Sequence, residues 1–337
     1  MNPQAHNDAP TLGTAAIPVR IIRDLDIQEA LEVPKIVERI EAGYLADARG
    51  EVVPFPRTRF DANGVFLAWQ GAAIPTQELL GFRSYVYNAE GYDRGDQVVV
   101  LYGHSTMDVR AVFVGRLVGN LRTGAALAAA IHLAEPQLQE VGIIGTGSQA
   151  RNALACIAST SRPSRVIAWS PNPSRREEFR SWSKQVLGLP VELGRDPAEV
   201  IRTVPTVVLV TAAETTVVTP EMVTDPKLFL SISAYRRPEI DSSLLDAALR
   251  VWTDSVAQAS GAGTLFESTA RRAKLRPLGE GIADGSARDP TSNRIIINTG
   301  AAWEELVVAQ MMYELAEARN LGVSISMPKE RPGAAVF

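Results

Sequence analysis

The chain has 337 residues, which is enough for one large domain or two ordinary ones. Hydrophobic residues make up 46% and charged residues 21%, a composition typical of a folded, water-soluble protein. The net charge is -4, both signs are scattered along the chain, and no long basic run is present. This charge pattern gives no support for a nucleic-acid partner.

The sequence lacks the usual signals of secretion, membrane insertion and metal binding. The first ten residues have neither the basic start nor the apolar stretch of a signal peptide, and no apolar run approaches the roughly 18–20 residues that cross a bilayer. A single cysteine, Cys156, excludes an internal disulfide and a cysteine cluster, and His6, His104 and His132 show no metal-ligand spacing. We therefore expect a cytoplasmic protein with no membrane partner and no metal site.

The N-terminal third predicts a small α+β unit. Residues 1–16 are polar and small and predict a flexible tail. Apolar positions between residues 27 and 48 recur at helical spacing, and a Pro-rich segment follows them. Short runs rich in β-formers then predict a mainly antiparallel sheet, with strands at residues 65–69, 82–87, 97–102 and 111–114.

The pattern changes near residue 122 to an alternation of strands and helices. An alanine-rich helix at residues 125–134 is followed by predicted strands at 141–144, 165–169, 206–211, 228–232 and 251–253, with helices at 149–158 and 175–187 after the first two. Strands that alternate with helices predict a parallel, doubly wound α/β sheet of the Rossmann type.

The last helix, residues 302–320, is apolar on so broad a face that it must pack against more than one neighbour. We expect it to return to the first unit. The predicted organisation is a flexible tail (1–16), a substrate-binding and dimerisation domain (17–122 and 302–330) and a Rossmann dinucleotide-binding domain (123–301).

A glycine-rich loop stands between the first predicted strand of the Rossmann domain and its helix. The loop has the Gly-x-Gly-x-x-Ala spacing of a dinucleotide-binding motif, and its residues are Gly145, Thr146, Gly147, Ser148, Gln149 and Ala150. The first glycine allows the tight turn, the second lets the backbone approach a pyrophosphate, and the alanine keeps the helix close to the sheet. The helix then offers its first N–H groups and the positive end of its dipole to the phosphates.

The end of the second strand bears on which dinucleotide is bound. An NAD site usually has an acidic residue there for the ribose hydroxyls, and this chain has none. Ser170, Asn172 and Arg175 are instead suited to hold a 2′-phosphate. The prediction is therefore NADP, with NAD as the alternative.

Several motifs resemble the ornithine cyclodeaminase/mu-crystallin family. Asn120-Leu121-Arg122-Thr123-Gly124-Ala125-Ala126 precedes the glycine loop at the family's spacing, and Pro56-Arg57-Thr58, Pro238-Glu239-Ile240 and Asn298-Thr299-Gly300-Ala301-Ala302 extend the match over about residues 30–325. The resemblance implies that the protein is a homodimer. It also implies that the protein, like other members of that family, passes hydride through a nicotinamide and acts on a small amino, imino or keto acid. We expect Thr211, Thr299 and Gly300 near the cofactor.

Matched by motif, Arg57 and Arg122 look like the arginines that hold the substrate carboxylate, with Arg59 as the rival of Arg57. A guanidinium suits this role because it offers a planar, bidentate fork and stays charged at any relevant pH. The family has a catalytic lysine where this chain has Arg83. Because an arginine does not give up its proton, Arg83 is expected in the site as a fixed cation.

Two further positions depart from the family and reshape the expected substrate pocket. The aspartate of the cyclodeaminases is replaced by Ser233, unless Tyr235 takes its place after a local shift, and Trp69 stands in a segment where the family often has Met-Pro. Both Ser233 and Trp69 are predicted substrate contacts. Without the aspartate, ring closure lacks its usual base, so the sequence favours a reductase or dehydrogenase acting on the C=N bond of a small imino acid. The alternatives are a cyclodeaminase that recycles NAD, and a non-catalytic, NADPH-bound ligand-binding protein of the crystallin type.

Overall fold

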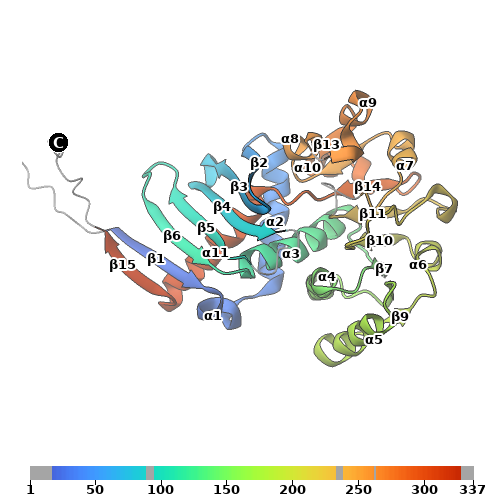
Figure 1. Ribbon diagram of the computed structural model, residues 1–337, viewed down its shortest axis with the longest axis horizontal. Coiled ribbons are helices and arrows are strands. Elements are labelled where there is room, and N and C mark those ends of the chain that lie inside the picture. The colour runs from blue at the N-terminus through green and yellow to red at the C-terminus, as the bar shows by residue number, and fades with distance from the viewer. Residues whose placement is uncertain (1–16, 89–94, 233–237, 262, 328–337) are drawn as a thin grey trace, which may run out of the picture.

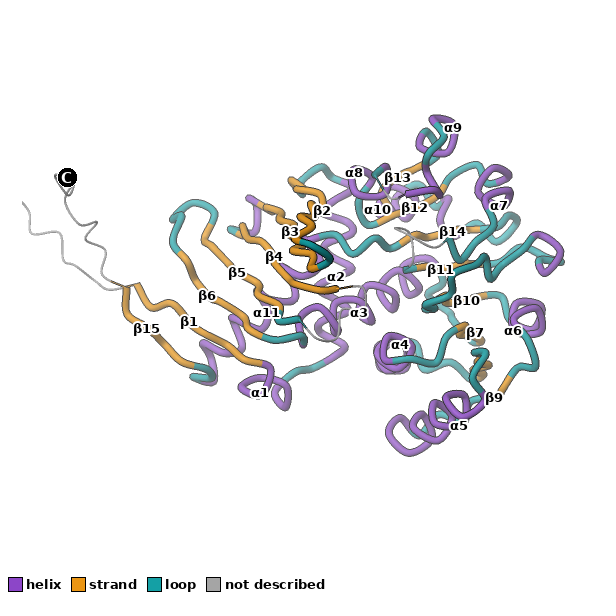
Figure 2. The backbone as a smooth tube through the Cα atoms, viewed as in Figure 1, coloured by secondary structure: helices purple, strands orange, loops and turns teal. Residues whose placement is uncertain are grey.

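A computed structural model describes residues 17–88, 95–232, 238–261 and 263–327 of the chain. Figure 1 shows two β-sheets at opposite ends of an elongated molecule, with helix α3 (Leu117–Ala134) running between them. The same division is clear in Figure 2, where the strands of each sheet form a separate orange group. The boundary expected between residues 122 and 123 falls inside α3, so one continuous helix belongs to both units.

The first sheet has seven strands in the order β15-β1-β6-β5-β4-β3-β2. It is antiparallel except where β1 runs parallel to β6. The four strands expected from the sequence correspond to β3 to β6; β1, β2 and β15 were not predicted. β2 contains Pro54 and Pro56, which an edge strand tolerates because one of its sides makes no ladder hydrogen bonds. The strands are β1 (Ile17–Arg23), β2 (Val53–Ala62), β3 (Val65–Ile74), β4 (Leu79–Asn88), β5 (Gln97–Gly103), β6 (Val109–Val114) and β15 (Val323–Met327).

Three long helices lie between the two sheets, and one of them, α11 (Ala302–Arg319), covers a face of the first sheet. α11 packs on β2, β3, β4 and β5 and also on α3 and α2 (Val33–Ala48), so the last helix lies against the first sheet. α3 is long and apolar enough to cross a membrane, contrary to the expectation that no run is, but 72% of that stretch is buried inside the molecule. We interpret α3 as the central core helix. A short helix, α1 (Asp24–Ile27), precedes α2.

The second sheet is parallel throughout and has the order β13-β12-β14-β11-β10-β7-β8-β9. The predicted α/β class, a doubly wound Rossmann sheet joined to an α+β unit, is confirmed. Its strands are β7 (Glu140–Ile144), β8 (Arg165–Trp169), β9 (Glu192–Leu193), β10 (Thr206–Leu209), β11 (Leu228–Ser231), β12 (Val251–Thr253), β13 (Leu275–Pro277) and β14 (Arg294–Ile297). The helices that connect them are α4 (Ser148–Thr160), α5 (Pro173–Trp182), α6 (Pro197–Thr203), α7 (Ser242–Ala247), α8 (Val256–Ser260), α9 (Thr269–Arg272) and α10 (Leu278–Ala283).

The strand order reverses beside β7, which lies between β8 on one side and β10 on the other. Ligands of open α/β sheets bind at such a switch point, outside the carboxyl ends of the strands. Because the strands are parallel, the residues that follow β7, β10, β11 and β14 all lie at this one edge. The fold therefore brings the glycine loop and the Asn298-Thr299-Gly300 segment to the same side of the molecule.

Candidate active site

The glycine loop has a geometry that leaves room for a ligand. Gly145 has φ of +109°, and its N–H donates to Trp169 O at 2.8 Å. A side chain at Gly145 would also collide with Val210 O, so glycine is required by the protein itself. Gly147 is different, because a Cβ placed there would meet no atom within 4 Å. The open space at Gly147 is what a closely approaching diphosphate needs.

Helix α4 begins directly after this loop, with Gly147 as its N-cap, so no N-cap side chain bonds to its first N–H groups. Ser148, Gln149 and Ala150 form the first turn, and Ala150 is fully buried against the sheet. In the described part of the chain, the buried Gln149 Oε1 has no hydrogen-bond partner. An uncapped helix start and an open glycine together fit the diphosphate of a nicotinamide dinucleotide.

The residues predicted to choose between NAD and NADP lie at the end of β8. Thr146 Oγ1 and Ser170 Oγ are 2.7 Å apart, which ties the glycine loop to the strand end. Asn172 accepts the N–H of Arg175 at 3.1 Å and so caps α5. The Arg175 side chain is exposed, whereas Arg176 donates to Gly194 O at 3.0 Å. The Ser170 hydroxyl and the exposed Arg175 guanidinium therefore stand where an NAD site usually has an acidic residue.

Thr211 follows β10 at the same edge of the sheet. Both its N–H and its hydroxyl donate to Glu239 Oε1 at 2.7 Å, and Ser231 Oγ donates to Glu239 Oε2 at 2.6 Å. Glu239 is 1% exposed and joins the ends of β10 and β11. The sequence analysis identified Glu239 only as part of the Pro238-Glu239-Ile240 motif. Its bridging role depends on two strands that are far apart in the chain.

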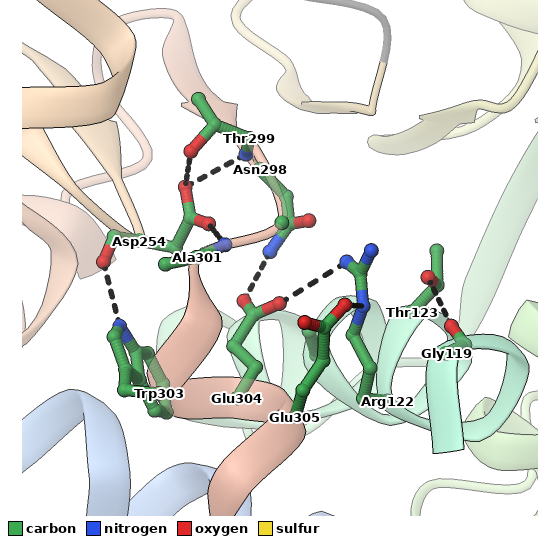
Figure 3. Close-up of polar contacts among 12 residues, drawn as sticks. Gly119, Arg122, Thr123, Asp254, Asn298, Thr299, Ala301, Trp303, Glu304 and Glu305 are labelled. Atoms are coloured by element: carbon green, nitrogen blue, oxygen red, sulfur yellow. Dashed lines mark hydrogen bonds and ion pairs between the residues drawn. The ribbon is translucent and has the colours of Figure 1, made fainter. Parts of the chain in front are cut away.

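The loop after β14 is held by a buried carboxylate that the sequence analysis did not single out. Asp254 accepts from Thr299 N at 2.7 Å, from Thr299 Oγ1 at 2.8 Å and from Ala301 N at 2.6 Å (Figure 3). Its backbone oxygen also accepts from Trp303 Nε1 at 2.9 Å. Asp254 directly follows the predicted strand at 251–253. The sequence signal that could have identified Asp254 is its position, since it is an acidic residue at the carboxyl end of a predicted parallel strand.

Arg122 points from α3 toward the start of α11, where it meets two consecutive carboxyl groups (Figure 3). Its Nε donates to Glu305 Oε1 at 3.1 Å, and its Nη1 donates to Glu304 Oε2 at 3.2 Å. Arg122 lies inside α3 and not ahead of the helix as the sequence suggested. Its guanidinium is 2.6 Å from where a Cβ of Gly300 would stand, so Gly300 makes room for it.

The antiparallel sheet supplies the other side of this cluster. Arg57 Nε donates to Gln70 Oε1 at 2.9 Å, and Arg57 Nη2 donates to Gly300 O at 2.9 Å. Gln70 Nε2 donates in turn to Glu305 Oε2 at 2.7 Å.

Arg83 pairs with Glu305 and donates to Gln97 Oε1 at 2.6 Å. The predicted Arg57, Arg83 and Arg122 thus converge around Glu305 and the Thr299-Gly300 loop, which we call the arginine cluster.

The two adjacent carboxyls of the arginine cluster have opposite protonation tendencies. Burial raises the pKa of Glu304 well above its usual 4.5, and the nearby Asp254 raises it further, against the opposing effect of Arg122. Burial would also raise the pKa of Glu305, but Arg83 and Arg122 outweigh that effect, and this pKa is lowered. The surroundings therefore favour the protonated form of Glu304 and the ionised form of Glu305.

One predicted substrate contact, Trp69, does not join the arginine cluster. Trp69 precedes Gln70 on β3, and successive strand residues point to opposite faces. Its ring packs against Phe55 and Phe82, so the tryptophan lies on the outer face of the sheet. This placement gives no support to Trp69 as a substrate contact beside the arginines. Ser233, together with its alternative Tyr235, lies outside the described residues.

Cys156 is a buried core residue. It is 2% exposed on α4, and burial raises the pKa of its thiol to about 12. Within the described part of the chain, no group of three or more histidine, cysteine, aspartate or glutamate side chains has a metal-binding arrangement.

Comparisons with known proteins give a consistent result. Residues 20–320 match the model of the ornithine cyclodeaminase/mu-crystallin family. The iminosuccinate reductase of Paracoccus denitrificans is 26% identical over 324 residues, which cover 91% of this chain and 99% of that protein. A crystal structure of that reductase with NAD+ has a TM-score of 0.82 and 25% identity, covering 92% of this chain and all of the other.

A second reductase is also similar. The Δ1-pyrroline-2-carboxylate reductase of Bacillus cereus is 25% identical over 240 residues, which cover 68% of this chain and 73% of that protein. The enzyme of that name from Thermococcus litoralis, solved with NADH and L-proline, has 19% identity and a TM-score of 0.79, covering 91% of this chain and all of the other.

Proposed function

Because the chain belongs to the ornithine cyclodeaminase/mu-crystallin family, we propose that it is an NAD(P)H-dependent reductase of the C=N bond of a small imino acid, or a dehydrogenase of the corresponding amino acid. The observation that carries the proposal is the position of the arginine cluster. It lies at the carboxyl edge of the parallel sheet, where the glycine loop also opens. The relatives named above are reductases of iminosuccinate and of Δ1-pyrroline-2-carboxylate.

The arginine cluster supplies binding and orientation. Arg57 and Arg122 lie on two sides of Gly300 and together present guanidinium groups to a substrate carboxylate. Glu305 and Gln70 hold these side chains in place through the hydrogen bonds described above. When bound, the nicotinamide supplies the hydride for the imine carbon. Fixing the carboxylate fixes that carbon, and such positioning is a large part of the rate gain in bimolecular reactions.

Arg83 in place of a lysine is compatible with reduction of an iminium ion. Its guanidinium stays protonated, so it transfers no proton. A protonated C=N group that accepts hydride becomes a neutral amine and requires no proton from the protein. Cyclodeamination, in contrast, requires a base for the attacking amine. The fixed charge of Arg83 therefore favours the reductase over the cyclodeaminase.

NADPH is the proposed cofactor, with NADH as the alternative. The support is the hydroxyl pair of Thr146 and Ser170 and the exposed Arg175 at the start of α5, where an acidic residue would repel a 2′-phosphate. Titration calorimetry tests this proposal. Arg175→Ala should weaken NADPH binding about tenfold, the loss expected for a charged hydrogen bond, and leave NADH binding unchanged. Arg180→Ala, on the same helix but paired with Glu177, is the control.

We also propose that the protein is a cytoplasmic homodimer that buries the outer face of the antiparallel sheet. This face exposes several large apolar side chains, among them Phe60 at 65%, Val53 at 59%, Phe55 at 49% and Trp69 at 37% exposed. Apolar patches of this kind mark interaction surfaces. Trp69→Glu should convert the dimer into a monomer in light scattering, and a dimer that persists in this variant would argue against this face.

A substrate panel tests the proposed reaction. Keto acids mixed with ammonium, and cyclic imino acids, should oxidise NADPH or NADH, measured as net loss of the nicotinamide absorbance. Release of ammonia from a diamino acid without net absorbance change would instead indicate a cyclodeaminase. Tight cofactor binding with no turnover of any imine would contradict the reductase and favour the ligand-binding protein.

A further inference from the structure

Gln258 joins the two units of the molecule beside the arginine cluster. It lies on the short helix α8 and is 2% exposed. Its Oε1 accepts from Arg57 N at 3.1 Å, and its Nε2 donates to Thr299 O at 2.9 Å and to Gly300 O at 3.1 Å. One buried amide therefore connects the strand that carries Arg57 to the loop that follows β14.

Arg57 lies at an irregular point of β2. The register between β2 and β3 shifts across Pro56-Arg57, where two residues of β2 oppose one residue of β3. A bulge of this kind interrupts the ladder and re-aims the side chains beside it, and bulges are frequent next to active sites. Gln258 supplies an acceptor for the Arg57 N–H from outside the sheet, since α8 packs against β2. The direction of the Arg57 side chain therefore depends on the Rossmann unit as well as on its own strand.

The Arg57 side chain binds the same loop carbonyls as Gln258. Its Nη2 donates to Gly300 O at 2.9 Å and to Thr299 O at 3.3 Å. These bonds close a ring that runs from the Arg57 backbone through the Gln258 amide to the loop, and back through the Arg57 guanidinium. The loop lies at the carboxyl edge of the parallel sheet, where the dinucleotide is proposed to bind. The ring therefore holds the guanidinium of Arg57 at a fixed distance from that edge.

We propose that Gln258 is a positioning residue for hydride transfer, which acts by aligning Arg57, and so the substrate carboxylate, with the nicotinamide. The inference rests on the proposed C=N reduction and adds a residue to it. In that reaction the iminium carbon gains a hydride from the reduced nicotinamide, which is thereby oxidised, and the C=N π electrons become the lone pair of a neutral amine. Gln258 exchanges no proton or electron. Its effect is on geometry, and an error of about 1 Å in the position of a reacting group can reduce a rate about 100-fold.

The first test uses the protein without cofactor. Gln258→Met keeps about the same side-chain length and removes both polar groups. Hydrogen exchange followed by mass spectrometry should show that a peptide from β2 loses the protection of one amide, that of Arg57, in this variant. Ser260→Ala is the matched control, because it lies on the same helix and loses only the hydrogen bond from its Oγ to Val256 O. This control should keep the protection. Unchanged exchange of the Arg57 amide in Gln258→Met would overturn the proposal.

The second test measures hydride transfer in single turnovers, with enzyme in excess over NADPH or NADH and with Δ1-pyrroline-2-carboxylate, or pyruvate plus ammonium, as the probe. Loss of folded protein lowers the amplitude of the absorbance change, whereas misalignment lowers its rate constant. The rate constant should fall about 100-fold in Gln258→Met. The Kd of this variant for the dinucleotide, and the rate constant of Ser260→Ala, should stay at the wild-type values. A wild-type rate constant with a reduced amplitude would mean that Gln258 only stabilises the fold, and would overturn the proposal.

Gln258→Glu covers the case in which Gln258→Met does not fold. Glutamate has the same shape and can still accept from Arg57 N, but once ionised it turns a second acceptor oxygen toward the two loop carbonyls. Its rate constant relative to the wild type should therefore fall as the pH rises and the side chain ionises. A ratio of one at every pH would overturn the proposal. If the wild type reduces neither these probes nor any imine of the substrate panel, the reductase itself is contradicted.

Discussion

Glu304→Gln offers a sharp test of the charge state at the site. Glu304 is fully buried, and its Oε1 accepts from Asn298 Nδ2 at 2.5 Å while its Oε2 accepts from Arg122. If Glu304 carries a proton, an amide replaces a neutral group of the same shape. Asn298 needs only a half-turn of its amide to present an oxygen to the new N–H group. We therefore expect little loss of stability near pH 5.

The free energy of unfolding of Glu304→Gln, relative to that of the wild type, should increase with pH. The folded pKa of Glu304 lies above its unfolded value near 4.5, so its stabilising effect is complete below about pH 4.5 and is lost as the pH rises toward the folded pKa. In that window the wild type loses up to about 1.4 kcal/mol of unfolding free energy per pH unit through this group. Glu304→Gln lacks this term, so its stability relative to the wild type should rise with pH.

Glu305→Gln is the matched comparison, because it removes the ionised neighbour. Arg83 and Arg122 would keep their charges without the carboxylate, and breaking a buried ion pair from one side costs about 3–5 kcal/mol. The pKa of Glu305 is lowered, so its contribution is present above about pH 4.5 and is lost in acid.

The assay is urea unfolding of the wild type and both variants across a pH series, followed by tryptophan fluorescence. A pH-independent difference between Glu304→Gln and the wild type would refute the reasoning. So would a loss in Glu304→Gln as large as that in Glu305→Gln, because it would mean that Glu304 is ionised.

Four further outcomes are expected. Gly147→Ala should unfold at the wild-type temperature without cofactor but bind dinucleotide at least tenfold more weakly by calorimetry, since only the ligand occupies that space. Gly145→Ala, which collides with Val210 O at a φ of +109°, should lower the unfolding temperature itself. Arg122→Ala should raise KM for the imino acid about 10- to 100-fold or abolish turnover, and unchanged kinetics would remove it from the site. Cys156 should react with a thiol reagent only after unfolding, in a mass-spectrometric labelling time course, because its pKa is about 12.

The sequence by itself determined the parts of this protein that depend on short segments. The glycine loop is specified by six consecutive residues, because a strand, a tight turn and a helix start are local structures. The Rossmann unit follows from regular alternation of strands and helices, and the motifs around Arg57 and Arg122 named the two arginines that the fold then brings to Gly300. The Pro-containing strand β2 escaped prediction, since local propensity argues against a strand that only an edge position permits.

Tertiary structure alone decided the chemistry of the site. Trp69 and Gln70 are neighbours, and alternation puts them on opposite faces, but nothing local shows which face α11 covers. Because α11 packs on that side, Gln70 reaches Glu305, and Trp69 lies outside. The opposite pKa shifts of Glu304 and Glu305 arise in the same way, from burial and from guanidiniums that lie more than 180 residues away along the chain. Contacts over such separations depend on how the whole chain packs, which no short segment specifies.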